Sequence, residues 1–145
     1  MKISKAEGQR LIDAPKSAGS EELAWTPVRT PGTSTVFMWR IDFALTVEEP
    51  PSGGALLVEG QWYSANYGQI RLCVRSENAG LNITRLCLCD QHPGDLHWHH
   101  LDQCKGQVNR ISVSDPPGRL DDVDALLFDT FIPTLNITDF ARGML

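Results

Sequence analysis

Residues 81–104 read LNITRLCLCDQHPGDLHWHHLDQC, and this stretch holds all four histidines and three of the four cysteines of the chain. Polar and apolar residues alternate in residues 83–90 and again in residues 96–101, a period of two that is typical of strands with one buried face. The Pro93-Gly94 pair between these two segments is a turn signal. The stretch therefore predicts a β-hairpin whose loop is residues 91–95.

The hydrophobic pattern also predicts the register of this hairpin. A five-residue loop places Leu88 opposite Trp98 and Cys87 opposite His99, whereas a shift by one residue would mix the two faces of the hairpin. In the favoured register, four apolar side chains share one face: Leu86, Leu88, Leu96 and Trp98. The other face then carries Cys87, Cys89, His97 and His99.

The segments on both sides of the hairpin extend the prediction to a larger sheet. Four further segments have strand-like patterns: residues 36–47, 55–64, 69–75 and 107–113. Ser4 and Glu7 have the spacing of a capping box and predict a short helix to about Ile12. Residues 121–132 repeat apolar side chains at helical spacing, which predicts a second helix that Pro133 ends.

The predicted fold class is α+β, with a mainly antiparallel sheet of about six strands, a short N-terminal helix and a C-terminal helix. We expect a single domain over residues 1–145. Within it, residues 1–35 form an irregular N-terminal arm with the short helix, residues 36–113 the sheet and residues 121–132 the C-terminal helix. The arm is expected to be irregular because residues 16–35 are rich in Ser, Gly, Thr and Pro.

Composition limits the functional classes. With 145 residues, 41% hydrophobic and 21% charged, the chain is typical of an ordinary globular domain. The formal charge of -5 argues against a broad nucleic-acid footprint but leaves room for a local basic patch. No apolar run resembles a signal peptide or a membrane span, so we expect a cytoplasmic protein with reduced thiols and no membrane partner. The motifs GxxxxGK[ST], GxGxxG and GxSxG are absent.

The side of the sheet opposite the predicted core carries an unusual set of polar residues. Arginine binds phosphate and carboxylate groups in a bidentate manner, and histidine transfers protons near neutral pH. We therefore predict an anion-binding face with Arg40, Arg71, Arg75 and Arg85 as its anion-binding residues. Asp42, Cys73, Cys87, Cys89, His97 and His99 are expected on the same side.

Three interpretations of the Cys/His residues remain open at this point. Cys87, Cys89, His97 and His99 together form the ligand set of a structural zinc site, although the spacing is not that of a common zinc finger. His97 and His99 could instead act as base and acid in metal-independent RNA cleavage, with Arg71 and Arg85 holding phosphate. Buried cysteines also pack as small hydrophobic residues with no further role. The sequence leaves open whether the protein is an enzyme and whether it needs a cofactor.

One segment resembles a known family. Arg85-Leu86, His92-Pro93-Gly94 and residues 96–99 (LHWH) are similar to an Arg-Leu strand, a His/Pro/Gly turn and a His-x-His strand in a family of short, uncharacterised prokaryotic and phage domains. Some members lie near toxin–antitoxin or defence genes. The resemblance implies a small protein of the toxin–antitoxin or phage-conflict kind. From the Arg/His face we expect such a protein to bind a protein or nucleic-acid partner. The partner and the oligomeric state are not determined by the sequence.

Overall fold

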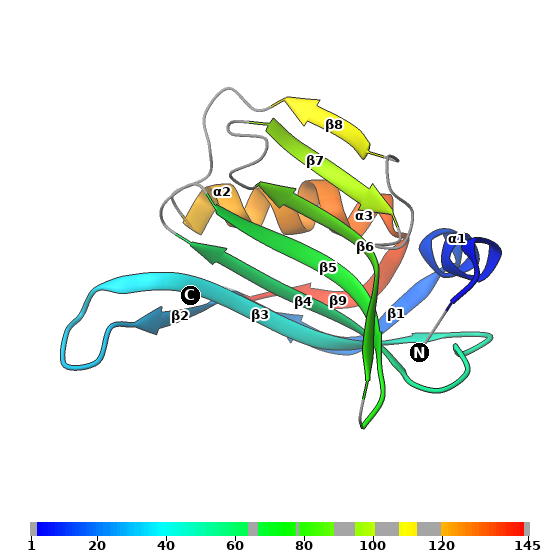
Figure 1. The fold of residues 1–145 in the computed structure, drawn as a ribbon. Helices are drawn as coiled ribbons and strands as arrows, with labels where there is room; N and C mark the ends of the chain where they lie inside the picture. Colours follow the sequence, from blue (N-terminus) through cyan, green and yellow to red (C-terminus); the bar gives the residue numbers. More distant parts are fainter. Residues whose placement is uncertain are drawn as a thin grey trace.

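The computed structural model describes residues 3–63, 67–77, 79–88, 95–100, 108–112 and 120–143. It confirms the α+β class, because a mostly antiparallel mixed sheet is combined with a short N-terminal helix and a helix near the C-terminus (Figure 1). The helical segments are α1 (Lys5–Asp13), α2 (Leu120–Ala125), the π-helical segment η1 (Leu126–Phe131) and α3 (Ile132–Thr134). The strands are β1 (Lys16–Leu23), β2 (Thr26–Arg29), β3 (Val36–Val47), β4 (Ala55–Tyr63), β5 (Tyr67–Arg75), β6 (Gly80–Leu88), β7 (Asp95–His100), β8 (Val108–Ser112) and β9 (Ile137–Arg142).

All of these strands belong to one sheet. Their order is β8-β7-β6-β5-β4-β3-β1-β9, and β2 pairs with the outer part of β3. The pairing of β1 with β9 is parallel, and the other pairings are antiparallel. Among the described residues, no helix has the length and apolar character needed to cross a membrane.

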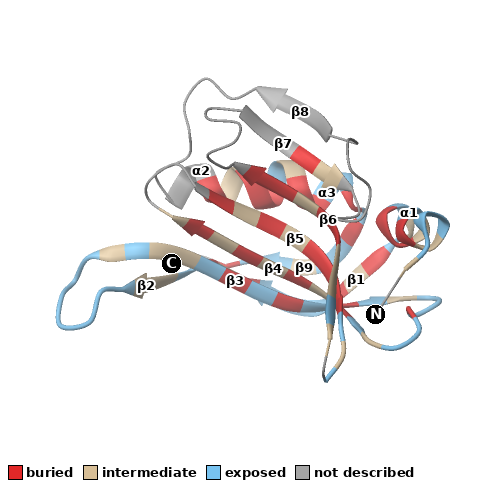
Figure 2. Ribbon diagram, viewed as in Figure 1, coloured by how far each residue is buried: buried red, intermediate tan, exposed pale blue. Residues whose placement is uncertain are grey.

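The C-terminal helix packs against one face of the sheet and supplies the centre of the core. Phe131 stacks on Trp98 of β7 with ring centroids 5.7 Å apart, and Phe128 lies 5.8 Å from Phe140 of β9. The helix therefore contacts strands from the two distant parts of the sheet. Its π-helical turns allow Leu127 to be buried together with these aromatic rings. Figure 2 shows the buried positions along the middle strands and on this helix.

The sheet is larger than predicted, with nine strands in the described part of the chain. The alternating segment 36–47 forms a strand over the predicted residues, and the strands near residues 55–64, 69–75 and 107–113 are also confirmed within a few positions. The prediction of an irregular arm after α1 is wrong, because β1 and β2 lie there, and β9 was not predicted. β1 contains Gly and Ser, β2 contains Pro, and β9 has only six residues, so none of them shows a long alternating pattern, and distant partners stabilise them.

The predicted hairpin register is wrong by two residues. Leu86 pairs with Trp98, Cys87 with His97 and Arg85 with His99. Asp95, expected in the loop, is the first residue of β7. Because a strand has a period of two, a two-residue shift changes the partners but preserves the faces. Cys89 and the predicted loop residues 91–94 lie outside the described residues.

A tryptophan fixes the corner between β1 and β2. Trp25 is fully buried, and a Cβ added at Gly60 would come within 2.8 Å of its Cη2 atom. Gly60 itself pairs regularly with Ile41 of β3 and Ile70 of β5. Glycine is needed here because the Trp25 ring occupies the space that a side chain would take.

A buried lysine joins the two helical parts of the fold. The Lys16 side chain is 1% exposed, and its Nζ donates hydrogen bonds to the carbonyl oxygens of Ile12 at 2.8 Å, Ala14 at 2.8 Å and Leu135 at 2.6 Å. The three ammonium protons thus satisfy three carbonyl groups at the C-terminal ends of α1 and α3. Asn136 strengthens this junction by donating from Nδ2 to the Asp13 carbonyl oxygen at 2.8 Å.

A bulge in β1 directs this strand away from β3. Gly19 and Ser20 have φ angles of 66° and 62°, and the register with β9 shifts between Ser17 and Glu21. The Asp139 carboxylate accepts hydrogen bonds from the Ser20 and Ser17 hydroxyls at 2.8 and 2.9 Å. These bonds lower the pKa of Asp139, because they stabilise its charged form. The bulge is therefore held by a carboxylate from β9.

We expect Lys16→Met to lower the free energy of unfolding by about 3 kcal/mol at pH 7, because three carbonyl groups lose their donor. Urea denaturation measures this change. Lys5→Met is the matched control, since Lys5 is exposed, and its effect should stay within about 0.5 kcal/mol. A Lys16→Met protein as stable as the wild type would contradict the role of this junction.

The pH dependence provides a second readout of Lys16. Burial lowers the pKa of Lys16 to about 8 from 10.5. Between these two values the unfolded chain keeps a proton that the folded protein has lost, so the wild-type free energy of unfolding should rise with pH in this range. The rise should be smaller in Lys16→Met than in Lys5→Met, and equal slopes would contradict the assignment.

Candidate functional site

The predicted polar face consists of aligned rows of side chains across neighbouring strands. The pairing connects Asp42 of β3 to Glu59, Glu59 to Arg71, Arg71 to Arg85, and Arg85 to His99 of β7. A second row runs beside it through Arg40, Gln61, Gln69, Cys87 and His97. We use the name polar face for these two rows together with Cys73 and Arg75.

Glu59 is the centre of the charged network on the polar face. One of its oxygens, Oε2, accepts hydrogen bonds from Arg71 Nη2 at 2.7 Å and from Arg75 Nη2 at 2.8 Å. The side chains of Glu59 and Arg71 are each 22% exposed, and that of Arg75 is 45% exposed. Arg40 lies 3.7 Å from Asp42 at the more exposed edge of the face. A single carboxylate therefore orients two of the predicted anion-binding arginines.

Two arginines occupy directly opposed positions on the polar face. Arg71 and Arg85 form a cross-strand pair between β5 and β6. Like charges in this arrangement repel each other and destabilise the sheet. The Arg71 Nε–H is also buried without a hydrogen-bond partner in the described part of the chain. Glu59 contacts Arg71 through Nη2, so it compensates this charge only in part.

Two cysteines lie beneath the charged side chains of the polar face. Cys73 is 1% exposed and Cys87 is 6% exposed, and both are free thiols. Cys73 Sγ lies 3.7 Å from the Leu57 carbonyl oxygen. Burial raises the pKa of Cys73, and the Glu59 carboxylate raises it further. The Cys73 thiol therefore stays protonated at neutral pH, as expected for a small buried residue.

The structure locates only part of the predicted metal and catalytic set. Cys87 pairs with His97 and Arg85 pairs with His99 in the β6–β7 ladder. Cys89 lies outside the described residues, and the structure describes the position of His97 in the strand but not its side chain. Within the described residues, no group of three or more His, Cys, Asp or Glu side chains is arranged to hold a metal ion.

A second candidate site, which was not predicted, lies where β1 separates from β3. Backbone pairing joins these strands at Ser17 and Thr46, and β2 pairs with β3 from Arg40 outward. Between these points residues 18–25 and 41–45 face each other with no pairing within residues 3–63. We call this opening the β1–β3 slot.

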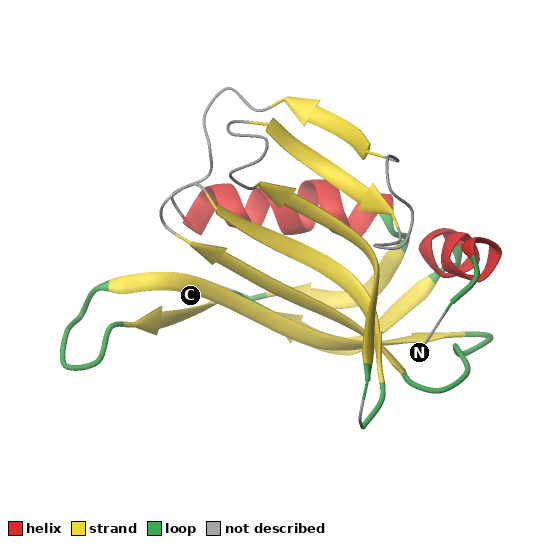
Figure 3. Ribbon diagram, in the orientation of Figure 1, coloured by secondary structure: helices red, strands yellow, loops and turns green. Residues whose placement is uncertain are grey.

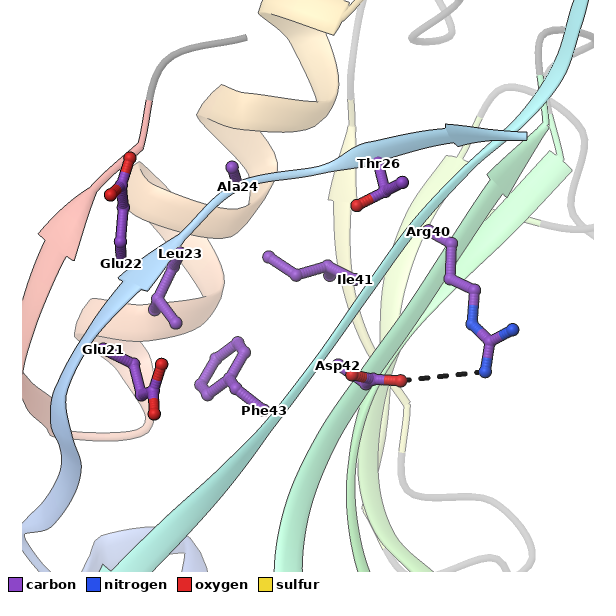
Figure 4. A pocket seen from close by; sticks show the side chains of 9 residues that line it. All are labelled: Glu21, Glu22, Leu23, Ala24, Thr26, Arg40, Ile41, Asp42 and Phe43. Atoms are coloured by element: carbon purple, nitrogen blue, oxygen red, sulfur yellow. Dashed lines mark ion pairs between the residues drawn. The ribbon is translucent and has the colours of Figure 1, made fainter. Parts of the chain in front are cut away.

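The β1–β3 slot contains two cavities of about 260 and 370 Å³, which share Glu21, Asp42 and Phe43 in their linings. Leu23 and Ile41 complete the apolar part of the smaller cavity, and Glu22 and Arg40 also line it. Figure 4 shows the apolar side chains between β1 and β3, with carboxylates from both strands beside them. The slot could not be predicted from local sequence patterns, because it arises where the bulge held by Asp139 separates β1 from β3.

Glu59 was also missed by the sequence analysis. Its alternation with the buried residues Val58 and Gly60, which places it on the same side as Arg71, is the signal that could have identified it. Comparison with family models, with curated proteins and with solved structures finds no match for this chain. Inferences about function therefore depend on the geometry of the two sites.

Glu59→Gln should lower the free energy of unfolding by about 1 to 2 kcal/mol, because Arg71 and Arg75 would lose their shared carboxylate while Arg85 remains opposite Arg71. Chemical denaturation measures the change. Glu48→Gln provides the matched control, because Glu48 is exposed and this substitution removes the same charge. Equal stability of the two variants would show that Glu59 does not organise the polar face.

Proposed function

We propose that this protein is a small binding protein that holds an anionic partner, a nucleic-acid strand or an acidic protein segment, against the polar face. The observation that carries the proposal is the direct pairing of Arg71 with Arg85. Directly opposed arginines concentrate positive charge at one place in a sheet, and sites that depart from the usual packing rules are often functional. An anion placed over the two guanidinium groups would relieve their repulsion.

The distribution of charge supports an anionic partner. The chain contains 13 Lys and Arg residues and 18 Asp and Glu residues. In contrast, the described side chains of the polar face include four arginines and two carboxylates, which are Arg40, Arg71, Arg75, Arg85, Asp42 and Glu59. A locally positive face on an acidic protein attracts anions to one place and repels them elsewhere.

The identity of the cationic residues also supports this proposal. All four are arginines, whose planar guanidinium groups bind phosphate and carboxylate through two hydrogen bonds. Glu59 fixes Nη2 of Arg71 and of Arg75, so these side chains are oriented before a partner binds. This preorganisation reduces the entropy lost on binding. Membership of the toxin–antitoxin or phage-conflict group stays a prediction.

Arg85→Gln should weaken binding of an anionic partner about tenfold, since one charge-assisted contact is lost. Fluorescence anisotropy with labelled oligodeoxythymidine and labelled polyglutamate measures affinity for the two partner classes. For the nucleic acid, the slope of log affinity against log salt should also fall by about one.

Lys5→Gln is the control for this experiment, because it removes one positive charge from α1 and leaves the polar face intact. Its affinity should equal that of the wild type. Preference for one probe would identify the class of partner. Absence of binding to both probes, or equal binding by Arg85→Gln and Lys5→Gln, would refute the proposal.

Metal-independent RNA cleavage by His97 and His99 is a second candidate function. The pairing of Arg85 with His99 favours it, because a phosphate held by Arg85 would lie near an imidazole group. Arg71 would then also hold phosphate. This activity would use the same polar face and would require an RNA partner.

A zinc-stabilised interaction module also stays a prediction, with Cys87, Cys89, His97 and His99 as ligands. The direct pairing of Cys87 with His97 brings one predicted thiol and one predicted imidazole to neighbouring strands. Stoichiometric zinc in the purified protein, lost in Cys87→Ser and kept in Cys73→Ser, would support this interpretation. Metal-free wild-type protein that folds normally would exclude it.

A further inference from the structure

The β2–β3 arm, residues 26–40, ends in a two-stranded tip, residues 29–37, that extends beyond β4, whereas residues 38–40 also pair with β4 (Figure 3). Its outer part carries Phe37, which is 41% exposed and is the one exposed large hydrophobic side chain among the described residues. A two-stranded ribbon has little stability of its own in water. An exposed aromatic side chain on such a ribbon indicates a surface that a partner covers.

Charge is distributed unevenly along this arm. Arg29 is the only charged residue between Leu23 and Trp39, and it pairs with Val36 near the tip. At the base of the arm, the β1–β3 slot is lined by three carboxylates, those of Glu21, Glu22 and Asp42, and by one guanidinium group, that of Arg40, which lies 3.7 Å from Asp42. Neither Arg29 nor Glu21 forms an ion pair with another described residue. The tip is thus basic and the base is acidic.

The slot also offers an open strand edge. Residues 41–45 of β3 pair with β4 on one side but have no strand partner on the slot side within residues 3–63. An extended segment could form backbone hydrogen bonds with this edge. The two cavities of the slot, of about 260 and 370 Å³, lie below and near the lower end of the range for small-molecule sites, and cavities of this size accommodate individual side chains of a protein.

The tip cannot reach the slot of its own chain, because Val36 and Arg40 are separated by about 13 Å of extended strand. In a dimer with a two-fold axis, the tip of one copy can reach the slot of the other copy. When two arms lie antiparallel, the tip of each comes to the base of the other. Both contacts then have the same complementary charges, as an isologous interface requires.

We propose that two copies of this chain associate by exchanging their β2–β3 arms, with Arg29 of each copy at the Glu21 side of the partner's β1–β3 slot and Phe37 covered between the copies. The interface shares Arg40 and Asp42 with the edge of the polar face, whereas Arg71, Arg75 and Arg85 lie outside the slot lining and stay available to an anionic partner. The proposal does not depend on the function proposed above.

Sedimentation velocity of the wild type between 1 and 200 µM tests this association, and a reversible dimer is expected. Arg29→Glu, Glu21→Lys and Phe37→Ser should each weaken the dimer at least tenfold, while the circular dichroism spectrum stays that of the folded protein. Lys5→Glu and Glu48→Lys are the controls, because they make the same charge changes away from the arm and should dimerise like the wild type.

Mixing the two charge variants gives the decisive result. In an equimolar mixture of Arg29→Glu with Glu21→Lys, each arm meets a slot of opposite charge, so the heterodimer should form although neither variant dimerises alone. The double variant Arg29→Glu/Glu21→Lys should dimerise by itself. A wild type that is monomeric at 200 µM, single variants that dimerise normally, or a mixture that stays monomeric would each overturn the proposal.

Discussion

The burial of one ammonium group, that of Lys16, is the constraint on which the arrangement of this fold depends. Carbonyl groups at the ends of α1 and α3 point toward the same buried position, where water cannot satisfy them. The lysine supplies three donors there and thereby fixes the starting point of β1 against the end of the C-terminal helix. The backbone N–H of Lys16 also donates to the Asn136 carbonyl oxygen at 2.9 Å. The first and last parts of the chain thus meet at one hydrogen-bonded junction, and β1 and β9 begin side by side.

The parallel β1–β9 pair has a direct consequence for the surface. Because β9 presents Asp139 beside Ser17 and Ser20, the chain adopts left-handed backbone conformations there and β1 bends toward β9. The strand cannot follow β9 and remain paired with β3, so the β1–β3 slot opens. Trp25 then brings the chain back over Gly60, where β2 resumes pairing with β3. The slot and the projecting arm are therefore two results of the same bulge.

The polar face does not depend on the bulge in β1. Its residues are placed by regular antiparallel pairing, and its geometry is stable because Glu59 offsets part of the repulsion among the arginines. Cys73 and Cys87 fit beneath these long side chains because they are small and tolerate burial without a strong hydrogen bond. The protein thus keeps its apolar core on the helix-bearing side and concentrates its cationic groups on the other. Such separation allows binding at the polar face without disturbing the packing around Phe131.

The sequence by itself determined the local periodicities. These were sufficient to predict β3 over its full length, the approximate positions of β4 to β8, the two helical regions and the side of the sheet that carries Arg71 and Arg85. Only the tertiary structure decided the features that depend on distant partners: the strands β1, β2 and β9, the two-residue shift of the hairpin, the role of Glu59 and the burial of Lys16. The physical reason is that alternation specifies which face a side chain occupies, whereas register and burial depend on packing energies between segments that are up to 123 residues apart in the chain.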